Sequence, residues 1–528
     1  MAARDYHEAT KHHFRAFARS PGYLDWATQP DPFRRFAGAR VTDLPRGAVR
    51  PDVAYASLYN GGVPPAPVTD HAIGELLRCT LGLSAWKRYG DAHWALRVNP
   101  SSGNLHPTEG YLVRDGLVAH YAPDAHALET RCVLPREAWE GFAPTGGEGV
   151  LVAFTSIAWR EAWKYGERAY RYCQHDVGHA IGALRLAAAL LGWRVHLLPR
   201  WSDAALARVV GADRTQDVVD GEHEVPACVA VVTPDDPAPW VTRDPAPLVA
   251  AAGAAGWHGT ANRLSPDHVA WPAIDAVAAA AVFPGDADAA GAPPPRAGAT
   301  SAAAPTATPG AASARALILQ RRSAVAFDGA STLPRETFLS MLDRLQPVGP
   351  PWDAVPWPPQ VHLALFVHRV DGLPPGLYAA TRDEGTAAEW RAAMRGDFLW
   401  ERHGPRLWLL APVDLRQAAQ QVSCNQEIAR DGFFSLGMIA RFGPALAARG
   451  DWFYRRLFWE CGLVGQVLYL EAEAAGARAT GIGCFFDDPV HELLGLDGDA
   501  WQSLYHFSMG VPVEDRRLTT EPGYPWDA

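Results

Sequence analysis

The sequence predicts two tandem copies of one domain that contains both helices and strands. Three observations lead to this prediction. Related residues recur at one constant offset of 284, a helical pattern recurs at an offset of 265, and a stretch rich in Ala, Pro and Gly separates the two copies. The residues repeated at 284 are Tyr170-Arg171, Asp176, Gly178, Gly192, Asp203 and Gly211, which match Tyr454-Arg455, Glu460, Gly462, Gly476, Asp487 and Gly495.

The domain boundaries follow from changes in composition. The N-terminal stretch is too aromatic for a disordered tail and is expected to pack on the body, whereas the stretch without core-forming residues is typical of a flexible linker. The predicted segments are, in order, an N-terminal arm (1–45), a first domain (46–260), a short helix after Ser265-Pro266 (261–283), the linker (284–314) and a second domain (315–528).

Apolar periodicity predicts the elements within each domain. In the first domain these are a helix over 70–81 capped by Asp70, a strand near 111–113, its return through 118–121, and one long helix from Glu161 to Leu191 that ends at Gly192. In the second domain the apolar positions Phe338, Met341 and Leu342 repeat Ile73, Leu76 and Leu77 at the offset of 265.

Length and composition limit the class of protein. The 528 residues are expected to form roughly two to four domains. A formal net charge of -10 without a Lys/Arg-rich run argues against non-specific binding to nucleic acid or anionic membranes. The seven cysteines include no CxxC pair, the N-terminus lacks an apolar signal core, and no apolar run approaches ~18 residues. We therefore expect a cytoplasmic protein that does not span a membrane.

The run from Asn99 to Glu109 carries the clearest functional signal in the first domain. Its sequence, Asn-Pro-Ser-Ser-Gly-Asn-Leu-His-Pro-Thr-Glu, suits a rigid loop better than a helix or strand interior. Such a loop offers hydroxyl, amide and backbone donors to a polar ligand. The residues with these groups or with a fixed backbone are Pro100, Ser101, Ser102 and Asn104.

The second domain carries two complementary signals. Arg321, Arg322 and Ser323, together with Arg516 and Arg517, supply guanidinium groups and a hydroxyl suited to a phosphate. The segment Gly481-Ile482-Gly483 lets the backbone approach a planar ligand and present its amides. No GxGxxG or GxxxxGK[ST] motif is present, so neither a nicotinamide Rossmann site nor a P-loop is supported.

Each copy lacks the signal that the other retains. At the repeat offsets, Ala56, Ser57 and Leu58 stand opposite the Arg-Arg-Ser segment, and Leu197 to Pro199 stand opposite Gly481 to Gly483. The second copy is also eight residues shorter between its first helix and the following Tyr, where a second Pro-Ser-Ser-Gly-Asn loop would lie. The repeat therefore indicates two halves of one site.

These motifs together resemble the FMN-dependent nitroreductase fold, and more specifically its SagB-type branch, which includes the azoline oxidases of peptide natural-product pathways. The resemblance covers about 50–230 and 315–520. It rests on the Arg-Arg-Ser segment, the Pro-Ser-Ser-x-Asn loop, the Tyr-Arg helices, the Gly-x-Gly segment, the run Tyr165 to Tyr172, and the closing Leu504 to Phe507 with Gly510 to Pro512.

The resemblance implies an α+β fold in which the two nitroreductase-like domains form an intramolecular pseudo-dimer around long packed helices. It also implies one composite FMN site, because in this family the arginine arm and the Gly-x-Gly segment come from one subunit and the loop from the other. The arginines and Ser323 would hold the phosphate, the loop the ribityl chain or ring edge, and Gly481 to Gly483 the reactive side of the ring. Family members often carry a further Arg where Val325 stands, which puts the phosphate affinity in doubt.

Two sets of residues are candidates for chemistry beyond the flavin. Lys164 and Tyr165 match a Lys-Tyr pair that related azoline oxidases use for proton removal, and the alternative is the exposed start of a helix. His175 and His179 lie one helical turn apart and could bind zinc, but no third ligand is evident, so no metal is predicted. Cys484 is expected to be a small packed residue.

Three hypotheses for function remain open. The first is an FMN oxidoreductase that oxidises a small or peptide-borne heterocycle with O2, or reduces nitro or quinone compounds with NAD(P)H. The second is a flavin-binding or flavinless scaffold that acts with other enzymes. The third is a zinc hydrolase built on His175 and His179. Retention of all parts of one composite site favours the first, and further oligomerisation of the pseudo-dimer is compatible with it.

Overall fold

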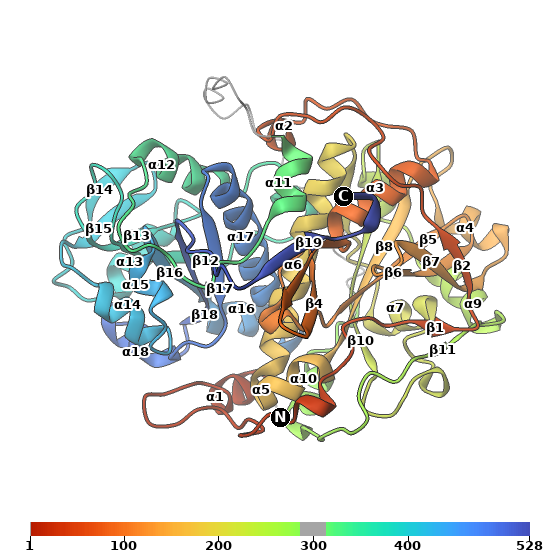
Figure 1. The fold of residues 1–528 in the computed structure, drawn as a ribbon, viewed down its shortest axis with the longest axis horizontal. Coiled ribbons are helices and arrows are strands. Elements are labelled where there is room, and N and C mark those ends of the chain that lie inside the picture. Colours follow the sequence, from red (N-terminus) through yellow and green to blue (C-terminus); the bar gives the residue numbers. More distant parts are fainter. Residues whose placement is uncertain (1, 286–312, 528) are drawn as a thin grey trace.

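The computed structural model describes residues 2–285 and 313–527, and it contains two halves that lie side by side around two central helices (Figure 1). Each half holds one seven-stranded sheet, with strand orders β2-β7-β6-β5-β8-β10-β9 and β14-β15-β13-β12-β16-β18-β17. The strands pair antiparallel throughout both sheets. The prediction of an α+β fold made of two related halves is confirmed.

The strands of the two sheets have the following bounds. In the first half they are β2 (Arg40–Asp43), β5 (Thr108–Arg114), β6 (Leu117–Ala122), β7 (Ala127–Val133), β8 (Val150–Ile157), β9 (Arg194–Leu197) and β10 (Glu224–Thr233). In the second half they are β12 (Val361–Val367), β13 (Gly376–Ala380), β14 (Glu401–Gly404), β15 (Leu407–Ala411), β16 (Phe434–Arg441), β17 (Arg478–Ile482) and β18 (Trp501–Gly510).

The repeat offset of 284 relates elements as well as residues. It superimposes the ranges of β8 and β16, of the helices α5 (Ala158–Tyr165) and α16 (Phe442–Arg449), and of α7 (Asp203–Val210) and α18 (Asp487–Leu494). The offset of 265 relates α3 (Asp70–Thr80) to α12 (Arg335–Arg344). The other helices of four or more residues are α1 (Ala3–Ala9), α2 (Ser57–Asn60), α4 (Arg136–Phe142), α8 (Ala238–Val241), α9 (Ala246–Ala254), α10 (Pro272–Ala280), α11 (Ala314–Gln320), α13 (Thr386–Ala393), α14 (Arg416–Val422) and α15 (Ile428–Asp431).

The two halves meet along α6 (Ala169–Leu190) and α17 (Tyr454–Ala474), which occupy the centre of the molecule. Every residue of α6 is buried. Gly178 and Gly462, which correspond at the offset of 284, let the helices touch: a Cβ on Gly178 would collide with the carbonyl of Trp459, and one on Gly462 with the carbonyl of His175. Glycine is therefore required at both positions by close helix packing.

Two reciprocal ion pairs join the halves. Arg171 of α6 donates to Asp487 of the second half at 2.8 Å, and Arg455 of α17 donates to Asp203 of the first half at 2.6 Å. Both residues of the second pair lie 284 positions from their counterparts. The recurrence of the same buried contact in both directions shows that the halves are related by a pseudo-twofold arrangement.

The predicted long helix is wrong in one respect, because it is interrupted between α5 and α6. A 3-10 turn over Gly166–Arg168 separates the two helices, and Gly166 has a φ of 58°. A Cβ at Gly166 would collide with the carbonyl of Arg19, which also accepts a hydrogen bond from the Glu167 amide at 3.0 Å. The N-terminal segment therefore packs against the interruption, a long-range contact that helical periodicity does not reveal.

Three smaller differences concern helix ends and the linker. Thr69, not Asp70, caps α3, because its hydroxyl accepts the Ala72 amide at 3.2 Å. The helix expected after Pro266 begins only at Pro272, since the Ser265 hydroxyl bonds to the Thr28 carbonyl at 2.9 Å instead. Most of the predicted linker, residues 286–312, lies outside the described residues.

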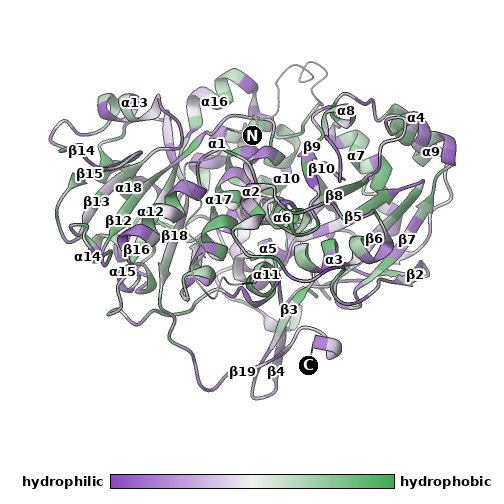
Figure 2. Ribbon diagram, turned by 90° about the horizontal axis from the view of Figure 1, so that it is seen from above, coloured by the Kyte–Doolittle hydropathy of each residue, from purple (hydrophilic) through white to green (hydrophobic). Residues whose placement is uncertain are grey.

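The C-terminal segment crosses from the second half to the first. Strand β19 (Thr519–Pro522) pairs with β3 (Leu83–Tyr89), which in turn pairs with β4 (Ala92–Arg97). Figure 2 shows this three-stranded sheet projecting from the centre of the molecule, next to the C-terminus. A further short pair joins β1 (Phe36–Ala37) to β11 (Thr260–Ala261). Among the described residues, no helix combines the length and apolar character needed to cross a bilayer.

Candidate composite site between the halves

The loop from Asn99 to Glu109 leads from β4 to β5 and is held by its own side chains. The Ser101 hydroxyl accepts the His106 amide at 2.8 Å, and the Asn104 side chain donates to the Ala95 carbonyl at 2.9 Å. Gly103, Asn104 and His106 have φ values of 59°, 61° and 53°. Left-handed residues at Gly103, Asn104 and His106, together with these side-chain hydrogen bonds, constrain the loop as its composition predicts.

Asp176 of the central helix α6 fixes this loop, a role that the sequence did not reveal. The amide and the hydroxyl of Ser102 donate to its carboxylate at 3.1 and 3.2 Å. Asp176 is fully buried, and burial raises the pKa of its carboxyl to about 7 even though the hydrogen bonds from Ser101 and Ser102 lower it. The loop is therefore attached to the interface between the halves by a carboxyl that titrates near neutral pH.

The arginine arm follows α11 in the second half and reaches the loop of the first half. Arg321 donates from Nε to the Val98 carbonyl at 2.8 Å and from Nη2 to the Arg97 carbonyl at 3.0 Å. Ser323 forms a parallel bridge with Ala479 of β17, so the arm also lies beside the strand that carries Gly481. Arg321 and Val98, which are 223 positions apart in the sequence, thus meet just before the Pro-Ser-Ser-Gly-Asn loop.

A group of cations surrounds this arm. Burial and the neighbouring charges of Arg321 and Arg478 lower the pKa of Arg322 to about 10, against an opposing influence of Glu473. Lys87 of β3 is close enough that Arg322 and Arg478 lower its pKa as well, after burial. Cationic side chains that lower each other's pKa are stabilised when an anion binds among them. Arg478 and Lys87 were not identified from sequence, and Val325 is 75% exposed.

The segment Gly481-Ile482-Gly483 forms the end of β17 and lies among tyrosines. The Gly481 amide donates to the Tyr469 hydroxyl at 2.8 Å, and that hydroxyl also accepts from Ser323 at 3.1 Å. A Cβ on Gly481 would collide with the Tyr505 hydroxyl, and one on Gly483 would lie 2.5 Å from the Tyr172 ring. Glycine is needed at both positions because aromatic side chains pack directly on the backbone.

Lys164 and Tyr165 end α5 next to the loop. A Cβ on Gly103 would lie 2.6 Å from the Tyr165 hydroxyl, and the Tyr165 ring packs edge-on against Tyr172 at 4.6 Å. The Lys164 ammonium lies 5.2 Å from the centre of the Tyr165 ring. Burial, followed by the charge of Glu161, raises the pKa of Tyr165 well above its usual value. The structure therefore places Tyr165, with Lys164 beside it, next to the loop. The region between the halves that contains this loop, the arm Arg321–Ser323 and the segment Gly481–Gly483 is called the junction below.

Several buried polar atoms at this junction have no hydrogen-bond partner. Among the described residues they include Arg321 Nη1, both nitrogens of His179 and both carboxyl oxygens of Glu161. Burial raises the pKa of Glu161 well above its usual value, while burial and the charge of Arg321 lower that of His179 to about 3. Buried polar groups in folded proteins normally have hydrogen-bond partners. Unsatisfied atoms also occur elsewhere among the described residues, and those at the junction are compatible with a polar ligand bound between the halves.

His175 and His179 take part in packing around the site. The His175 ring stacks on Tyr505 with centroids 4.0 Å apart, and its Nε2 bonds to the Leu504 carbonyl at 3.0 Å. Within the part of the chain that the structure describes, this pair does not gather with a third metal-binding side chain. The helical spacing that could suit zinc thus places two imidazoles beside the aromatic residues of the junction.

Arg516 and Arg517 lie elsewhere. Both are exposed, and Arg517 makes a bidentate pair with Asp515, with Nε and Nη2 at 2.9 and 2.7 Å. Its guanidinium also lies 5.5 Å from the ring of Tyr89, at the end of β3. The structure places neither of them among the contacts of Arg321, whereas Arg478 and Lys87 are neighbours of Arg322.

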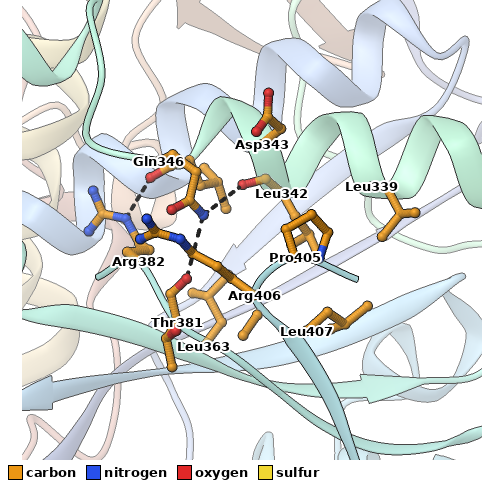
Figure 3. Close-up of a pocket in the computed structure, with 12 residues that line it drawn as sticks. Leu339, Leu342, Asp343, Gln346, Leu363, Thr381, Arg382, Pro405, Arg406 and Leu407 are labelled. Carbon is orange, nitrogen blue, oxygen red and sulfur yellow. Dashed lines mark hydrogen bonds between the residues drawn. The ribbon is translucent and has the colours of Figure 1, made fainter. Parts of the chain in front are cut away.

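Two cavities in the described structure differ in their relation to the junction. One, of about 90 Å³, lies in the second half between α12 and the sheet, where the Arg382 side chain donates to the Leu345 carbonyl at 2.7 Å (Figure 3). It is far smaller than typical ligand sites of ~300–1,000 Å³. The other has about 420 Å³ and adjoins the loop at Asn104 and Leu105. Its walls include Trp26, Asp31, Phe33, Trp86, His93 and Trp94.

The chain is similar to several solved structures, to different degrees. A structure of a proposed nitroreductase from Anabaena variabilis is 21% identical and matches 97% of this chain and 99% of its own, with a TM-score of 0.65. A proposed nitroreductase from Ralstonia eutropha is 15% identical over 41% of this chain and 97% of its own, with a TM-score of 0.28. A chain of the E. coli microcin synthetase McbBCD complex with truncated pro-MccB17 is 16% identical over 44% and 88%, with a TM-score of 0.26.

The family assignment rests on the sequence of both halves. No curated protein matches the chain. The model of the nitroreductase family matches twice, at residues 64–221 and 318–511, and these two segments make up more than half of the chain. The chain therefore belongs to the nitroreductase family.

Proposed function

We propose that the protein is an FMN-dependent oxidoreductase with one composite FMN site, to which both halves of the chain contribute. The observation that carries this proposal is the contact of Arg321 with the carbonyls of Arg97 and Val98, at 3.0 and 2.8 Å. It joins the cations of the second half to the end of β4, directly before the Pro-Ser-Ser-Gly-Asn loop of the first half. The unsatisfied Arg321 Nη1 and the neighbouring Arg322 suit the phosphate of FMN, while the nearby Arg478 also pairs with Glu514 at 2.5 Å.

The residues at the junction divide the tasks of binding. Arg321, Arg322 and Ser323, with Arg478 as a further cation, would hold the phosphate. Ser101, Ser102 and Asn104 would hold the ribityl chain or the ring edge, and the amides of Gly481 to Gly483 would approach the reactive side of the ring. FMN, when bound, supplies the two-electron hydride chemistry. The protein orients it and excludes water through the tyrosines packed on Gly481 and Gly483.

Proton transfer is assigned to the end of α5. Tyr165 packs on Gly103, and Lys164 lies beside its ring, so the pair can remove or return a proton at the edge of the loop. Glu161, whose pKa is raised by burial, is a third candidate for proton transfer. The pair and the run from Tyr165 to Tyr172 support a SagB-type, azoline-oxidase-like branch that acts on a small or peptide-borne substrate. The cavity of about 420 Å³ beside Asn104 is the proposed approach for that substrate.

A flavinless partner protein is the second candidate, and one observation favours it. The Tyr469 hydroxyl already accepts the Gly481 amide, and the Tyr505 hydroxyl packs where a Cβ of Gly481 would lie. These contacts engage the backbone that would face the flavin ring. The two candidates differ in whether the purified protein binds FMN with the junction residues.

The test is FMN affinity in variants placed in opposite halves. Arg321→Met removes a charged donor and should raise the FMN Kd by about tenfold or more. Ser102→Ala removes a neutral hydroxyl from the other half and should raise it by a smaller factor, about two- to tenfold. Flavin fluorescence titration of the desalted protein measures both.

Matched controls exist at the corresponding positions of the repeat. Ser57→Ala, opposite Arg322, and Gln360→Ala, whose amide meets Glu460 as the Ser102 amide meets Asp176, should leave the Kd unchanged. An effect of only one of the two test variants contradicts the shared site. Absence of FMN binding by the parent protein favours the flavinless partner. Anaerobic reduction by NAD(P)H, compared with photoreduction, separates a reductase from an oxidase.

A further inference from the structure

A second cluster of chemically reactive side chains lies at the far end of the Gly481-Ile482-Gly483 segment. The Cys484 and Cys424 sulfurs are 2.9 Å apart, and His12 Nδ1 lies 3.7 Å from the Cys484 sulfur and 4.0 Å from that of Cys424. The three side chains are His12, Cys424 and Cys484, and all their ligand atoms lie within 4.8 Å of one another. The sequence predicts that Cys484 is a small packed residue. The structure instead places it beside a second thiol and an imidazole.

Three separate parts of the chain supply these side chains. His12 comes from the N-terminal arm, Cys424 from the turn between α14 and α15, and Cys484 from the residue after Gly483. Backbone bonds hold each of them: the His12 amide donates to Asp487 at 2.9 Å, and the Phe486 amide donates to the Val422 carbonyl at 2.8 Å. The convergence therefore does not depend on free side-chain rotation alone.

We propose that His12, Cys424 and Cys484 form a site for a single Zn²⁺ ion. Two thiolates and one imidazole are ligands that zinc prefers, and three protein ligands leave one position of a tetrahedral ion open. His12 is 8% exposed, while both cysteines are half-buried, so the open position faces partly toward solvent. No ligand of this set belongs to the proposed flavin site, and the inference does not rest on that proposal.

The distances suit zinc with a small adjustment. Ligands at about 2.3 Å for sulfur and 2.0–2.1 Å for nitrogen around a tetrahedral ion lie about 3.8 Å apart for two sulfurs and about 3.6 Å for sulfur and nitrogen. The imidazole is already at this spacing. The sulfurs need to separate by about 1 Å, and Cys424 lies in a turn where both it and Asn425 have positive φ.

A disulfide between Cys424 and Cys484 is the competing outcome. It requires the sulfurs to approach to about 2.05 Å and an external oxidant, and it gives the imidazole no role. The metal is favoured because His12, more than 400 residues away in the sequence, lies close to both sulfurs. Zinc would also tie the arm and the turn to the residue that follows Gly483.

The experiment is metal binding by the full-length protein. The protein is purified with reductant, its zinc is quantified by mass spectrometry, and the zinc is removed by a chelator and replaced by Co²⁺. We expect about one zinc per chain, and Co²⁺ difference spectra with thiolate-to-metal charge-transfer bands and tetrahedral d–d bands. Cys424→Ser, Cys484→Ser and His12→Ala should each weaken zinc binding by roughly tenfold or more.

The control variants are Cys228→Ser, at another half-buried cysteine, and His13→Ala, at the neighbouring histidine. Both should bind zinc as the parent does. Alkylation of the parent followed by peptide mass spectrometry needs no variant: zinc should protect Cys424 and Cys484 from reaction. The proposal is overturned if the reduced parent binds no zinc or cobalt, if metal leaves both cysteines equally reactive, or if only a Cys424–Cys484 disulfide is found.

Discussion

The junction at the Pro-Ser-Ser-Gly-Asn loop and its pseudo-symmetric counterpart share a framework but differ in which polar groups are paired. In the counterpart, Glu460 stands where Asp176 stands in the loop site, and it accepts the amides of Gln360 and Val361 at 3.0 and 3.1 Å. Both carboxylates therefore hold a chain segment from the central helices. The framework is a common structural feature of the duplicated domain.

The charges differ between the two places. In the counterpart, Glu460 forms an ion pair with Arg382, and Arg185 makes a bidentate pair with Asp353 at 2.8 and 2.7 Å. Arg185 stands where Tyr469 stands at the junction. At the junction, by contrast, cations gather and Arg321 Nη1, His179 and Glu161 keep unsatisfied atoms. The charges of the counterpart are paired within the protein. At the junction Arg478 is also paired, with Glu514 at 2.5 Å, so the difference between the two places lies in the unsatisfied atoms.

The two places also differ in their apolar side chains. Leu58 and Leu197, at the positions of Ser323 and Gly481, are 0% and 4% exposed. Side chains thus fill the counterpart where the junction has a hydroxyl and a bare glycine backbone. The comparison teaches that positions related by the repeat can serve as hydrophobic core in one half and present polar groups or bare backbone in the other.

The largest effect is expected in the counterpart. Glu460→Gln leaves Arg382 buried without its anionic partner, which should lower the free energy of unfolding by about 3–5 kcal/mol. The FMN content of the folded protein should not change, because this ion pair is not part of the junction. Urea denaturation and flavin quantification on the same samples test both statements, and selective loss of flavin contradicts the division of roles.

The next prediction concerns the pH dependence that Asp176 confers. Its pKa rises from 3.8 in its ordinary state to about 7 in the fold, so the folded state binds the proton more tightly. The stabilisation from this group is present below about pH 4 and is lost as the pH rises toward 7, with a slope of up to about 1.4 kcal/mol per unit.

Asp176→Asn removes this titration while it keeps an acceptor for Ser102. The difference in unfolding free energy between parent and variant should change between about pH 4 and pH 7, in favour of the variant at the higher pH, and then level off. Chemical denaturation at several pH values measures it. A constant difference across that range contradicts a raised pKa for Asp176.

A smaller effect is expected at Gly481. Gly481→Ala introduces a Cβ against the Tyr505 hydroxyl, and such overpacking should cost about 1–3 kcal/mol of stability. Tyr505→Phe removes the colliding atom, so the double variant should recover part of the loss. The melting temperatures of the three variants show whether this is so, and an additive loss in the double variant rejects the packing explanation.

The repeat arithmetic explains how much of the architecture could be predicted. The offset of 284 fixed by Tyr170, Gly178 and Gly192 carries over to the helices on both sides of α6 and α17, because both copies keep the same spacing. The break at Gly166 could not be predicted in this way. It depends on the packing of Arg19 from the N-terminal segment, which has no counterpart in helical periodicity.

The site was predictable only where a short motif carries it. Arg321 contacts the carbonyls of Arg97 and Val98, directly before the loop, and the composite binding site that the resemblance implies stays a prediction. Asp176, Arg478 and Tyr469 take part through strand pairing and helix packing, and nothing local in the sequence distinguishes them from structural residues. Arg517 is the opposite case. It is predicted as a phosphate ligand because it forms an Arg-Arg pair with Arg516, but it bonds to Asp515 away from the junction.

The stoichiometry of FMN tests the central claim most directly. Protein saturated with FMN, freed of excess by gel filtration and then denatured releases its flavin for quantification by absorbance against the chain concentration. The composite site predicts about one FMN per chain, since only one junction retains the arginine arm, the loop and the glycine segment. About two FMN per chain, or none, contradicts it.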